Sequence, residues 1–422
     1  MKLSTRLTLV APRQSRLYAA SVATDRVYRP SIIAAYALFV FVGISAGVGG
    51  VLLPAQISDY GVDKATIGLT FFTFSAGFMA AGATVGGLVH RLGIAHAIGV
   101  GGAVFTLAAL YTGVRPPFAA FVAVQIAAGY GIGVIESVLN AYLSELPAPS
   151  TLLNRLHGFF GAGALIGPAL AAWMLQSMRW TAVWLMLAAI SAVLFAAFLA
   201  ATRRVTEAKR SPEPGSPPKG LLLDSLRGPG VLFGALFLAV YVGLEISVGN
   251  WGFSFLVGHF GQTTLLAGYT ISGYWLGLTV GRFVISPLGA RVGMSPAATS
   301  FGCLVGVAVC ALLIWAAPIS ALAAAGFVLF GFFLAPLFPT AMAMTPRLTE
   351  KRLVPTAIGA MNGASVIGGS LFSWMSGAIA QGAGVWTLMP FALALALLLV
   401  VIWQRLVANL AVPTSEQAAE LV

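Results

Sequence analysis

Residues 241–255 read YVGLEISVGNWGFSF, and they lie inside an apolar run that extends from about residue 230 to 257. A run of this length can cross the hydrocarbon core of a bilayer as one helix, for which about 20 residues are needed. Glu245 stands near the middle of the run, where a charged side chain costs roughly 3 kcal/mol on insertion scales. Such a residue usually faces a partner or a water-filled cavity. The stretch therefore predicts a membrane-spanning helix with a functional carboxylate.

The whole chain has the composition of a membrane protein. It has 422 residues, of which 59% are hydrophobic and 8% are charged, whereas a soluble domain is about 25% charged. We predict an all-α membrane protein with twelve transmembrane helices. The apolar runs that are long enough to span a bilayer lie at residues 31–55, 65–89, 94–114, 118–143, 155–178, 180–201, 230–257, 264–289, 294–315, 319–345, 353–380 and 385–408.

One long polar segment, Thr202 to Gly228, interrupts these runs. It contains RRVTEAKRSPEPGSPPKG, whose content of Pro and charged residues is typical of a linker. The segment divides the helices into six plus six. The predicted organisation is a basic tail, a first bundle, a linker, a second bundle and a second tail, at residues 1–30, 31–201, 202–229, 230–408 and 409–422.

Most positive residues lie on one side of the predicted spans. Of the 23 Lys and Arg residues, only Lys64, Arg115 and Arg179 fall on the other side, and Arg282 lies within a span. Because loops rich in Lys and Arg stay in the cytoplasm, both termini and the linker are predicted to be cytoplasmic, in a plasma membrane such as the bacterial inner membrane. The net charge of +11 then reflects topology and indicates no nucleic-acid partner. The N-terminus lacks the apolar core of a secretory signal, although its Arg and Ser content also fits an organelle transit peptide.

The two halves of the chain share identities at a nearly constant offset. At an offset of 200 residues, six residues of the first half recur in the second half. In order, Gly68, Thr70, Gly77, Leu88, Arg91 and Gly93 match Gly268, Thr270, Gly277, Leu288, Arg291 and Gly293. At an offset of 201 residues, six more residues recur. In order, Gly158, Ile166, Gly167, Leu170, Trp173 and Met174 match Gly359, Ile367, Gly368, Leu371, Trp374 and Met375. Parallel repeats of six helices form two pseudo-symmetric halves with a substrate path between them.

A loop that follows both the second and the eighth predicted helix resembles a signature of the major facilitator superfamily. That signature reads glycine-x-leucine-x-aspartate-arginine-x-glycine and continues with basic residues. The first loop reads GGLVHRLG from Gly86 to Gly93, and the second reads PLGARVG from Pro287 to Gly293. His90 stands at the aspartate position, and the later basic pair is absent. Arg91 and Arg291, one in each loop, are candidates for gating or ion pairing.

The resemblance covers about residues 31–408, and it rests also on the six-plus-six helices and the central linker. It implies the major facilitator fold of two six-helix bundles. It also implies transport of a small-molecule solute by alternating access, with a path lined largely by helices 1, 4, 7 and 10. It places Glu136 of helix 4 and Glu245 of helix 7 on that path.

Two branches of the superfamily share motifs with this chain. The run GALIGPALAA at 163–172 resembles the glycine–proline motif of proton-linked drug antiporters, although two alanines replace its final glycines. The Glu136–Asn140 pair and the sequence of Glu245 followed by Trp251 look more like the fucose-permease-like branch.

Helix 4 carries a polar stripe. Helical spacing places Gln125, Gly129, Gly133, Glu136 and Asn140 on one face. A stripe of two amides and a carboxylate suits the wall of a wet cavity, and the alternative is a polar cluster that holds helices together. Gln125 and Asn140 are candidates for substrate binding, and Glu136 is a candidate for proton coupling.

Glu245 is the second candidate for proton coupling, because a carboxyl group whose exposure to water changes can take up and release a proton. Arg282 in helix 8 cannot shed its charge, so it needs a carboxylate, carbonyl groups or water. It either binds substrate or forms a gating ion pair with Glu136 or Glu245. Trp275 lies seven residues earlier on the same face and is a candidate for substrate binding. His157, in the first turn of helix 5, is interpreted as a packing residue.

Asn250 and Trp251 are further candidates for substrate binding. A Trp stacks on the C–H face of a sugar, and an Asn bonds its hydroxyls. On an intact helix, Asn250 lies about 140° from Glu245, so the group acts as one patch only if the flanking glycines unwind the helix. Trp251 fits an interfacial aromatic belt equally well. Asn362 begins a stripe of small polar residues in helix 11 and is a substrate-binding candidate, although such stripes also serve helix packing.

No motif indicates an enzyme, a cofactor or a metal site. A phosphate loop would need a Lys-Ser/Thr ending after a strand, and Cys303 and Cys310 are too far apart on one helix to form a bridge. We predict a monomeric secondary transporter for a small polar solute, for instance a sugar, with a proton, or else a sodium ion, as the coupling ion. The alternative is proton-linked efflux of a drug-like compound or metabolite, which the helix 5 motif and the 11% aromatic content favour.

Overall fold

The computed structural model describes residues 11–146, 149–202, 224 and 227–410, and all regular secondary structure in these residues is helical. Most of the predicted linker and the outer parts of both predicted tails lie outside the described residues. The long helices are α1 (Ala11–Tyr60), α3 (Leu69–Gly113), α4 (Phe118–Ser144), α5 (Pro149–Met174), α6 (Trp180–Thr202), α8 (Pro229–Phe260), α9 (Thr264–Arg291), α10 (Pro296–Trp315), α11 (Ser320–Leu334), α13 (Val354–Ala383) and α14 (Leu388–Leu410). The short ones are α2 (Lys64–Ile67), α12 (Leu337–Met344) and the 3-10 turns η1 (Thr345–Arg347), η2 (Lys351–Leu353) and η3 (Val385–Thr387).

These helices account for the twelve predicted spans. By length and composition alone, nine described segments can cross a membrane. One of them, Lys64–Gly113, holds two spans that meet at Gly93, where φ is 77° and ψ is 166°. The helices α9 and α13 fall outside that set, but with 28 and 30 residues they are long enough to span. The short helix α12 continues α11, so these two form the tenth span.

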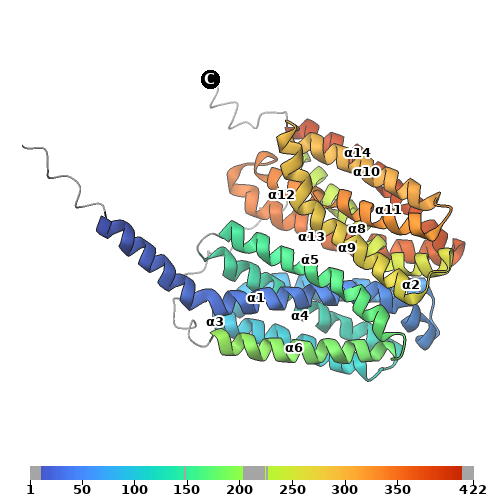
Figure 1. Cartoon of the computed structure of the whole chain (residues 1–422), viewed down its shortest axis with the longest axis horizontal. Coiled ribbons are helices and arrows are strands. Elements are labelled where there is room, and N and C mark those ends of the chain that lie inside the picture. The colour runs from blue at the N-terminus through green and yellow to red at the C-terminus, as the bar shows by residue number, and fades with distance from the viewer. Residues whose placement is uncertain (1–10, 147–148, 203–223, 225–226, 411–422) are drawn as a thin grey trace, which may run out of the picture.

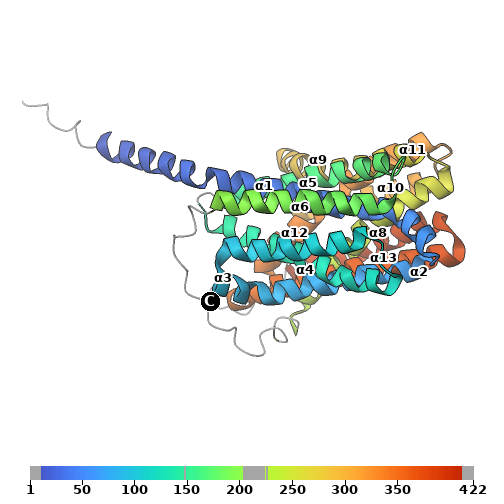
Figure 2. The ribbon, with the colours of Figure 1, turned by 90° about the horizontal axis from the view of Figure 1, so that it is seen from below.

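The helices pack in two groups, α1–α6 and α8–α14 (Figures 1 and 2). Equivalent contacts recur in both groups. A Cβ atom on Gly77 of α3 would collide with the Ile126 carbonyl of α4, and one on Gly277 of α9 would collide with the Val328 carbonyl of α11. Only glycine lets two helices approach this closely. The pair Gly77 and Gly277, found from the sequence offset, therefore occupies the same structural position in each group.

The connecting loops repeat as well. Gly93 and Gly293 both have left-handed backbone, with φ of 77° and 76°, and Gly61 and Gly261 both have φ of 63°. A side chain is strained in this conformation, and glycine is not. The glycines therefore end equivalent helices in the two groups and support the predicted internal repeat.

Each helix group has two ends, which are named here by their connections. The linker end is where α6 ends at Thr202 and α8 begins at Pro229. The loop end is the opposite one, where short loops such as 61–63 and 261–263 join successive helices. In Figure 1 the linker end is on the left and the loop end, next to the label α2, is on the right.

A polar cluster holds the loop end of the first group together. The Arg115 guanidinium forms a salt bridge of 2.7 Å with Asp59 and also donates to the Asp59 carbonyl oxygen. Trp180 Nε1 donates to the same carboxylate at 2.9 Å. The bond to Asp59 raises the pKa of Arg115 above its ordinary value. At the start of α2, the Thr66 N–H bonds the Asp63 carboxylate at 2.6 Å and holds the pKa of Asp63 below its ordinary value. The cluster ties the ends of α1, α3 and α6 to one another.

The structure adds two details about helix boundaries. The predicted tail at 1–30 is helical from Ala11 onward and continues into α1, which projects beyond the other helices (Figure 1). The glycines around Asn250 do not unwind helix 7, because α8 is continuous from Pro229 to Phe260. The interruption occurs instead in the tenth span, between Leu334 and Leu337, where Pro336 cannot donate a helical hydrogen bond.

Candidate functional site

Glu245 lies half-buried on α8, and aromatic residues fix the helix around it. The Tyr274 hydroxyl of α9 donates to the Glu245 carbonyl oxygen at 3.0 Å. Tyr241, one turn before Glu245, is fully buried and donates to the Leu334 carbonyl oxygen at 3.1 Å. Arg282 of α9 lies close enough for its positive charge to act on the carboxyl group of Glu245. The backbone of α8 around Glu245 is thus tied to α9 and to the end of α11.

Arg282 lies between the two helix groups. Its charge acts on Glu245 of α8 and on His157 of α5. The residues on either side of it contact α5, since Thr279 packs on Gly161 and Phe283 approaches the Cβ position of Gly158 to 3.4 Å. No salt bridge joins Arg282 to any carboxylate among the described residues. Of the two predicted partners, Arg282 therefore acts on Glu245, while no effect on Glu136 is found.

Two buried donors on this face of α9 lack acceptors. Arg282 Nε and Trp275 Nε1 are both buried without a hydrogen-bond partner in the described chain. They lie two helical turns apart, and the Trp275 ring packs 3.1 Å from the Cβ position of Gly249 on α8. A buried donor without a partner costs about 1–3 kcal/mol. This face of α9 therefore holds two donors that no atom of the described chain satisfies.

The residues of the polar stripe on α4 make contacts with α3 and hydrogen bonds within α4. Gly129 and Gly133 pack directly against α3, at Phe74 and Phe78, so this part of the stripe is a helix contact. Gln125 is buried and donates to the Phe121 carbonyl oxygen at 3.3 Å in its own helix. Asn140 likewise donates to the Glu136 carbonyl oxygen at 2.8 Å. The interpretation of the whole stripe as a cavity wall is therefore too broad.

Glu136 is the other carboxylate within a span. It is half-buried, and its side chain forms no hydrogen bond or salt bridge with the described residues. The structure does not bring it to Arg282. It remains a candidate for proton coupling on its own.

Asn250 and Trp251 point away from Glu245 and toward α13. Asn250 Nδ2 donates to Ser373 Oγ at 3.0 Å, and Trp251 Nε1 donates to the Ser373 carbonyl oxygen at 2.8 Å. Trp251 is 2% exposed and packs against Gly377, so it does not belong to an interfacial belt. Because α8 is continuous, the three residues do not form one patch. Asn362, by contrast, is exposed on α13, near the linker end.

The two loop arginines form no ion pairs in the described part of the chain. Arg91 and Arg291 are both exposed, next to the left-handed Gly93 and Gly293. The three salt bridges that the described residues form lie elsewhere. A gating role for either residue stays a prediction.

The sequence interpretation missed a row of contacts between the helix groups, which we call the loop-end seam. It consists of Lys64, Ala65 and Ser75 on one side and Ser370, Trp374 and Gln381 on α13. The Lys64 backbone N–H donates to Gln381 Oε1 at 3.2 Å, and Trp374 Nε1 donates to the Ala65 carbonyl oxygen at 3.1 Å. Ser370 bonds Ser75 and the Phe71 carbonyl oxygen. The signal available in the sequence was the pairing of Trp374 with Trp173 across the repeat.

The seam does not continue to the linker end. Farther along α3, a Cβ atom on Gly82, Gly86 or Gly87 would meet nothing within 4 Å, and the same is true of Gly359 and Gly363 on α13. On the opposite side of the molecule, α5 and α9 stay in contact from Gly268 as far as Phe283. The helix groups therefore meet at the loop end and separate between α3 and α13 toward the linker end.

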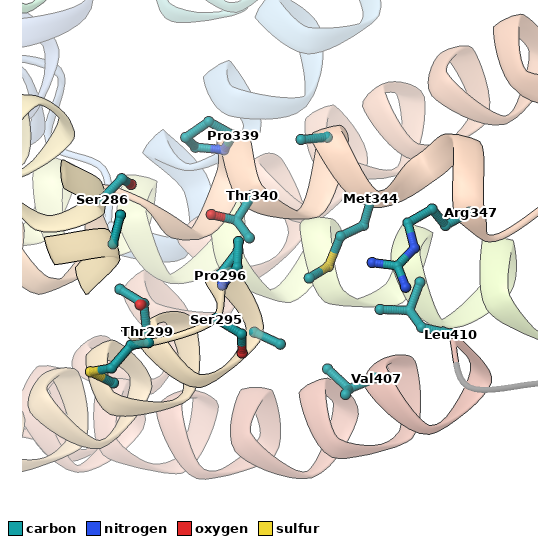
Figure 3. Close-up of a pocket in the computed structure, with 14 residues that line it drawn as sticks. Ser286, Ser295, Pro296, Thr299, Pro339, Thr340, Met344, Arg347, Val407 and Leu410 are labelled. Atoms are coloured by element: carbon teal, nitrogen blue, oxygen red, sulfur yellow. The ribbon is translucent and has the colours of Figure 1, made fainter. Parts of the chain in front are cut away.

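A cleft of about 710 Å³ lies away from these residues, at the linker end of the second group. It is lined from α9, α10, α12, η1 and α14 (Figure 3). None of the predicted site residues lines it. In the described residues, no cluster of His, Cys, Asp or Glu could hold a metal ion.

Comparisons with known proteins agree with this architecture. Residues 35–299 and 246–420 match the family model of the Major Facilitator Superfamily. Bypass of stop codon protein 6 of Saccharomyces cerevisiae is 24% identical over 401 residues, which cover 88% of this chain and 81% of that protein. The glucose/galactose transporter of Brucella abortus is 24% identical over 376 residues, which cover 82% of this chain and 87% of that protein.

Solved structures share the fold. The nucleoside transporter NupG superposes with a TM-score of 0.73 at 14% identity, over 92% of this chain and 99% of its own. The fucose:proton symporter FucP of E. coli superposes with a TM-score of 0.60 at 16% identity, over 88% and 97%. The paired helix groups, the repeated glycine contacts and these matches lead to one conclusion: the chain belongs to the Major Facilitator Superfamily and is a multi-pass membrane transporter, not an enzyme.

Proposed function

We propose that this transporter moves a small polar solute, such as a sugar or a nucleoside, together with a proton, by alternating access of a site between its two helix groups. The observation that carries the proposal is the position of Glu245. It is a half-buried carboxylate within a membrane-spanning helix, and Arg282, which forms no salt bridge among the described residues, lies on the adjacent helix within reach of its charge. An ionisable pair held apart at this depth has a cost in stability, which a role in transport explains.

The physical basis for proton coupling is the response of a carboxyl group to its surroundings. Loss of water favours the protonated form, whereas a nearby positive charge or hydrogen-bond donor favours the ionised form. Arg282 lies in the contact between α5 and α9, so a rocking motion of the helix groups would change its distance from Glu245. Uptake and release of the proton would then follow the conformational change.

Support for alternating access comes from the contacts between the groups. They are closed at the loop end, and α3 and α13 separate toward the linker end. We propose that the site is open to the linker end in this state and that the loop-end seam breaks in the opposite state. With the Lys- and Arg-rich side in the cytoplasm, this state would face inward, and the protein would work as a monomer in the plasma membrane.

The proposed solute class rests on the donors and acceptors near Glu245. Trp275 Nε1 and Arg282 Nε are donors without acceptors, and the Glu245 carboxyl group is an acceptor. A polyhydroxylated solute supplies both kinds of group at once. The transporters that this chain resembles are named for glucose and galactose, fucose and nucleosides, and all of these are neutral polyhydroxylated compounds.

The test is counterflow and uptake by purified protein in proteoliposomes. A panel of hexoses, deoxyhexoses and nucleosides is screened first, with an imposed pH gradient and, separately, a sodium gradient. We expect accumulation of a polyhydroxylated solute that follows the pH gradient. Accumulation that follows only the sodium gradient would contradict the proton as the coupling ion. Outward transport of drug-like cations, without transport of any solute in the panel, would contradict the proposed solute class.

Glu245→Gln is the decisive variant for coupling. It removes the titratable proton and keeps the shape of the side chain, so we expect accumulation against a gradient to be lost while solute exchange continues. Glu145→Gln, an exposed residue at the end of α4, is the matched control and should accumulate normally. If Glu245→Gln accumulates solute and Glu136→Gln does not, the coupling residue is Glu136.

A further inference from the structure

The cleft at the linker end of the second helix group has a charged group at one end and apolar walls. Of the described side chains that line it, only Arg347 is charged. Its guanidinium turns toward Met344 and Leu410 (Figure 3). Arg347 forms no salt bridge in the described part of the chain. Pro296, Pro339 and Val407 add apolar wall, and Ser295 and Thr340 add hydroxyls.

The cleft lies at the level where the helices end. The helix α9 ends at Arg291, and α10 begins at Pro296, directly after Ser295, whose side chain caps the helix by accepting from the Ala298 N–H at 3.2 Å. The neighbouring apolar residues Leu288 and Met294 are 55% and 43% exposed. Apolar exposure next to helix ends and basic residues is typical of the boundary between the hydrocarbon core and the polar headgroups.

We propose that this cleft binds an anionic phospholipid, with the phosphate on Arg347 and an acyl chain along the apolar wall. The inference does not depend on which solute is transported. The occupant is indicated by charge complementarity, because the described lining holds one positive charge and no acidic residue, and Arg291 and Lys351 lie close to it in sequence. A guanidinium fits a phosphate through paired hydrogen bonds, and basic pockets between membrane helices bind anionic headgroups. The cleft volume of about 710 Å³ accommodates a headgroup and part of one chain but not a whole lipid.

The test is native mass spectrometry of the full chain released from detergent micelles that contain equal amounts of phosphatidylglycerol and phosphatidylcholine with matched acyl chains. We expect selective retention of one phosphatidylglycerol. Arg347→Gln should weaken that retention about tenfold, as expected when one charge-assisted hydrogen bond is lost, and Arg347→Lys should retain part of it. The matched control is Arg405→Gln, an exposed arginine on α14 outside the cleft, which should behave like the wild type.

A second variant tests the apolar wall without changing charge. Ala343→Trp fills the cleft from α12, and we expect it to reduce retention as well. Circular dichroism and thermal unfolding in lipid-free detergent report whether each variant is folded, and a variant that unfolds is replaced by Ala343→Leu. An excess of inorganic phosphate should not displace the lipid.

Four outcomes would overturn the proposal. Equal retention of the two lipids would mean that the cleft takes neutral lipid. An equal loss in Arg347→Gln and Arg405→Gln would mean diffuse surface attraction. Unchanged retention in the folded Ala343 variant would place the lipid outside the cleft, and displacement by phosphate would reduce the site to an anion site.

Discussion

At the scale of single residues, the proposed site consists of a carboxylate and a guanidinium on adjacent helices that form no salt bridge with each other. Glu245 is fixed through its backbone by Tyr274, and the neighbouring Tyr241 is bonded to Leu334. Arg282 faces the other helix group and has a buried Nε without a partner. Such an arrangement stabilises neither group fully, so either can respond when the helices move.

Arg282→Met tests whether this residue is kept for function and not for stability. Methionine keeps most of the apolar stem and removes the charge. We therefore expect the free energy of unfolding to rise by roughly 1–3 kcal/mol and the unfolding temperature to rise with it. Coupled uptake should be lost. The measurements are thermal unfolding and proteoliposome uptake, with exposed Arg405→Met as the control. A lower unfolding temperature for Arg282→Met would show that the guanidinium has a structural partner.

At the scale of helices, the close approach of α3 to α4 and of α9 to α11 depends on glycines. A methyl group on Gly77 or Gly277 would collide with a backbone carbonyl, which cannot move as a side chain can. Overpacking of this kind typically costs about 1–3 kcal/mol. These contacts hold each helix group together as a unit.

Gly77→Ala and Gly277→Ala are therefore expected to lower the unfolding temperature in detergent by similar amounts, because the two positions are equivalent in the repeat. Gly82→Ala is the control on the same helix as Gly77. Its Cβ would meet nothing within 4 Å, and alanine favours a helix over glycine. Equal stability of Gly77→Ala and Gly82→Ala would contradict the packing described here.

The helices show how far sequence reasoning reaches. Apolar length predicts the spans, and the offset between the halves finds Gly77 with Gly277 because both features are local. Helical periodicity also places Gln125 and Gly129 on one face of α4, but it cannot say that α3 covers that face. For the same reason, the glycines around Asn250 allow unwinding, whereas in the fold α8 is continuous and Asn250 donates to Ser373. Neighbours across the bundle, including Tyr274 beside Glu245, come only from the fold.

At the scale of the whole molecule, two helix groups meet along a seam at the loop end and separate toward the linker end between α3 and α13. The seam consists of a few hydrogen bonds, such as those of Lys64 with Gln381 and of Trp374 with Ala65. Each such bond contributes only about 0.5–1.5 kcal/mol net. A seam of this size can open and close within a transport cycle, as the proposed alternating access requires.

The most direct test of this mechanism is a disulfide across the seam. The Ser75 and Ser370 hydroxyl groups are in direct contact, so Ser75→Cys with Ser370→Cys is expected to form a bond on oxidation that locks the loop end shut. Counterflow of solute should stop in the oxidised double variant and return on reduction, while the oxidised single variants continue to exchange. Undiminished counterflow with the disulfide intact would contradict alternating access through this seam.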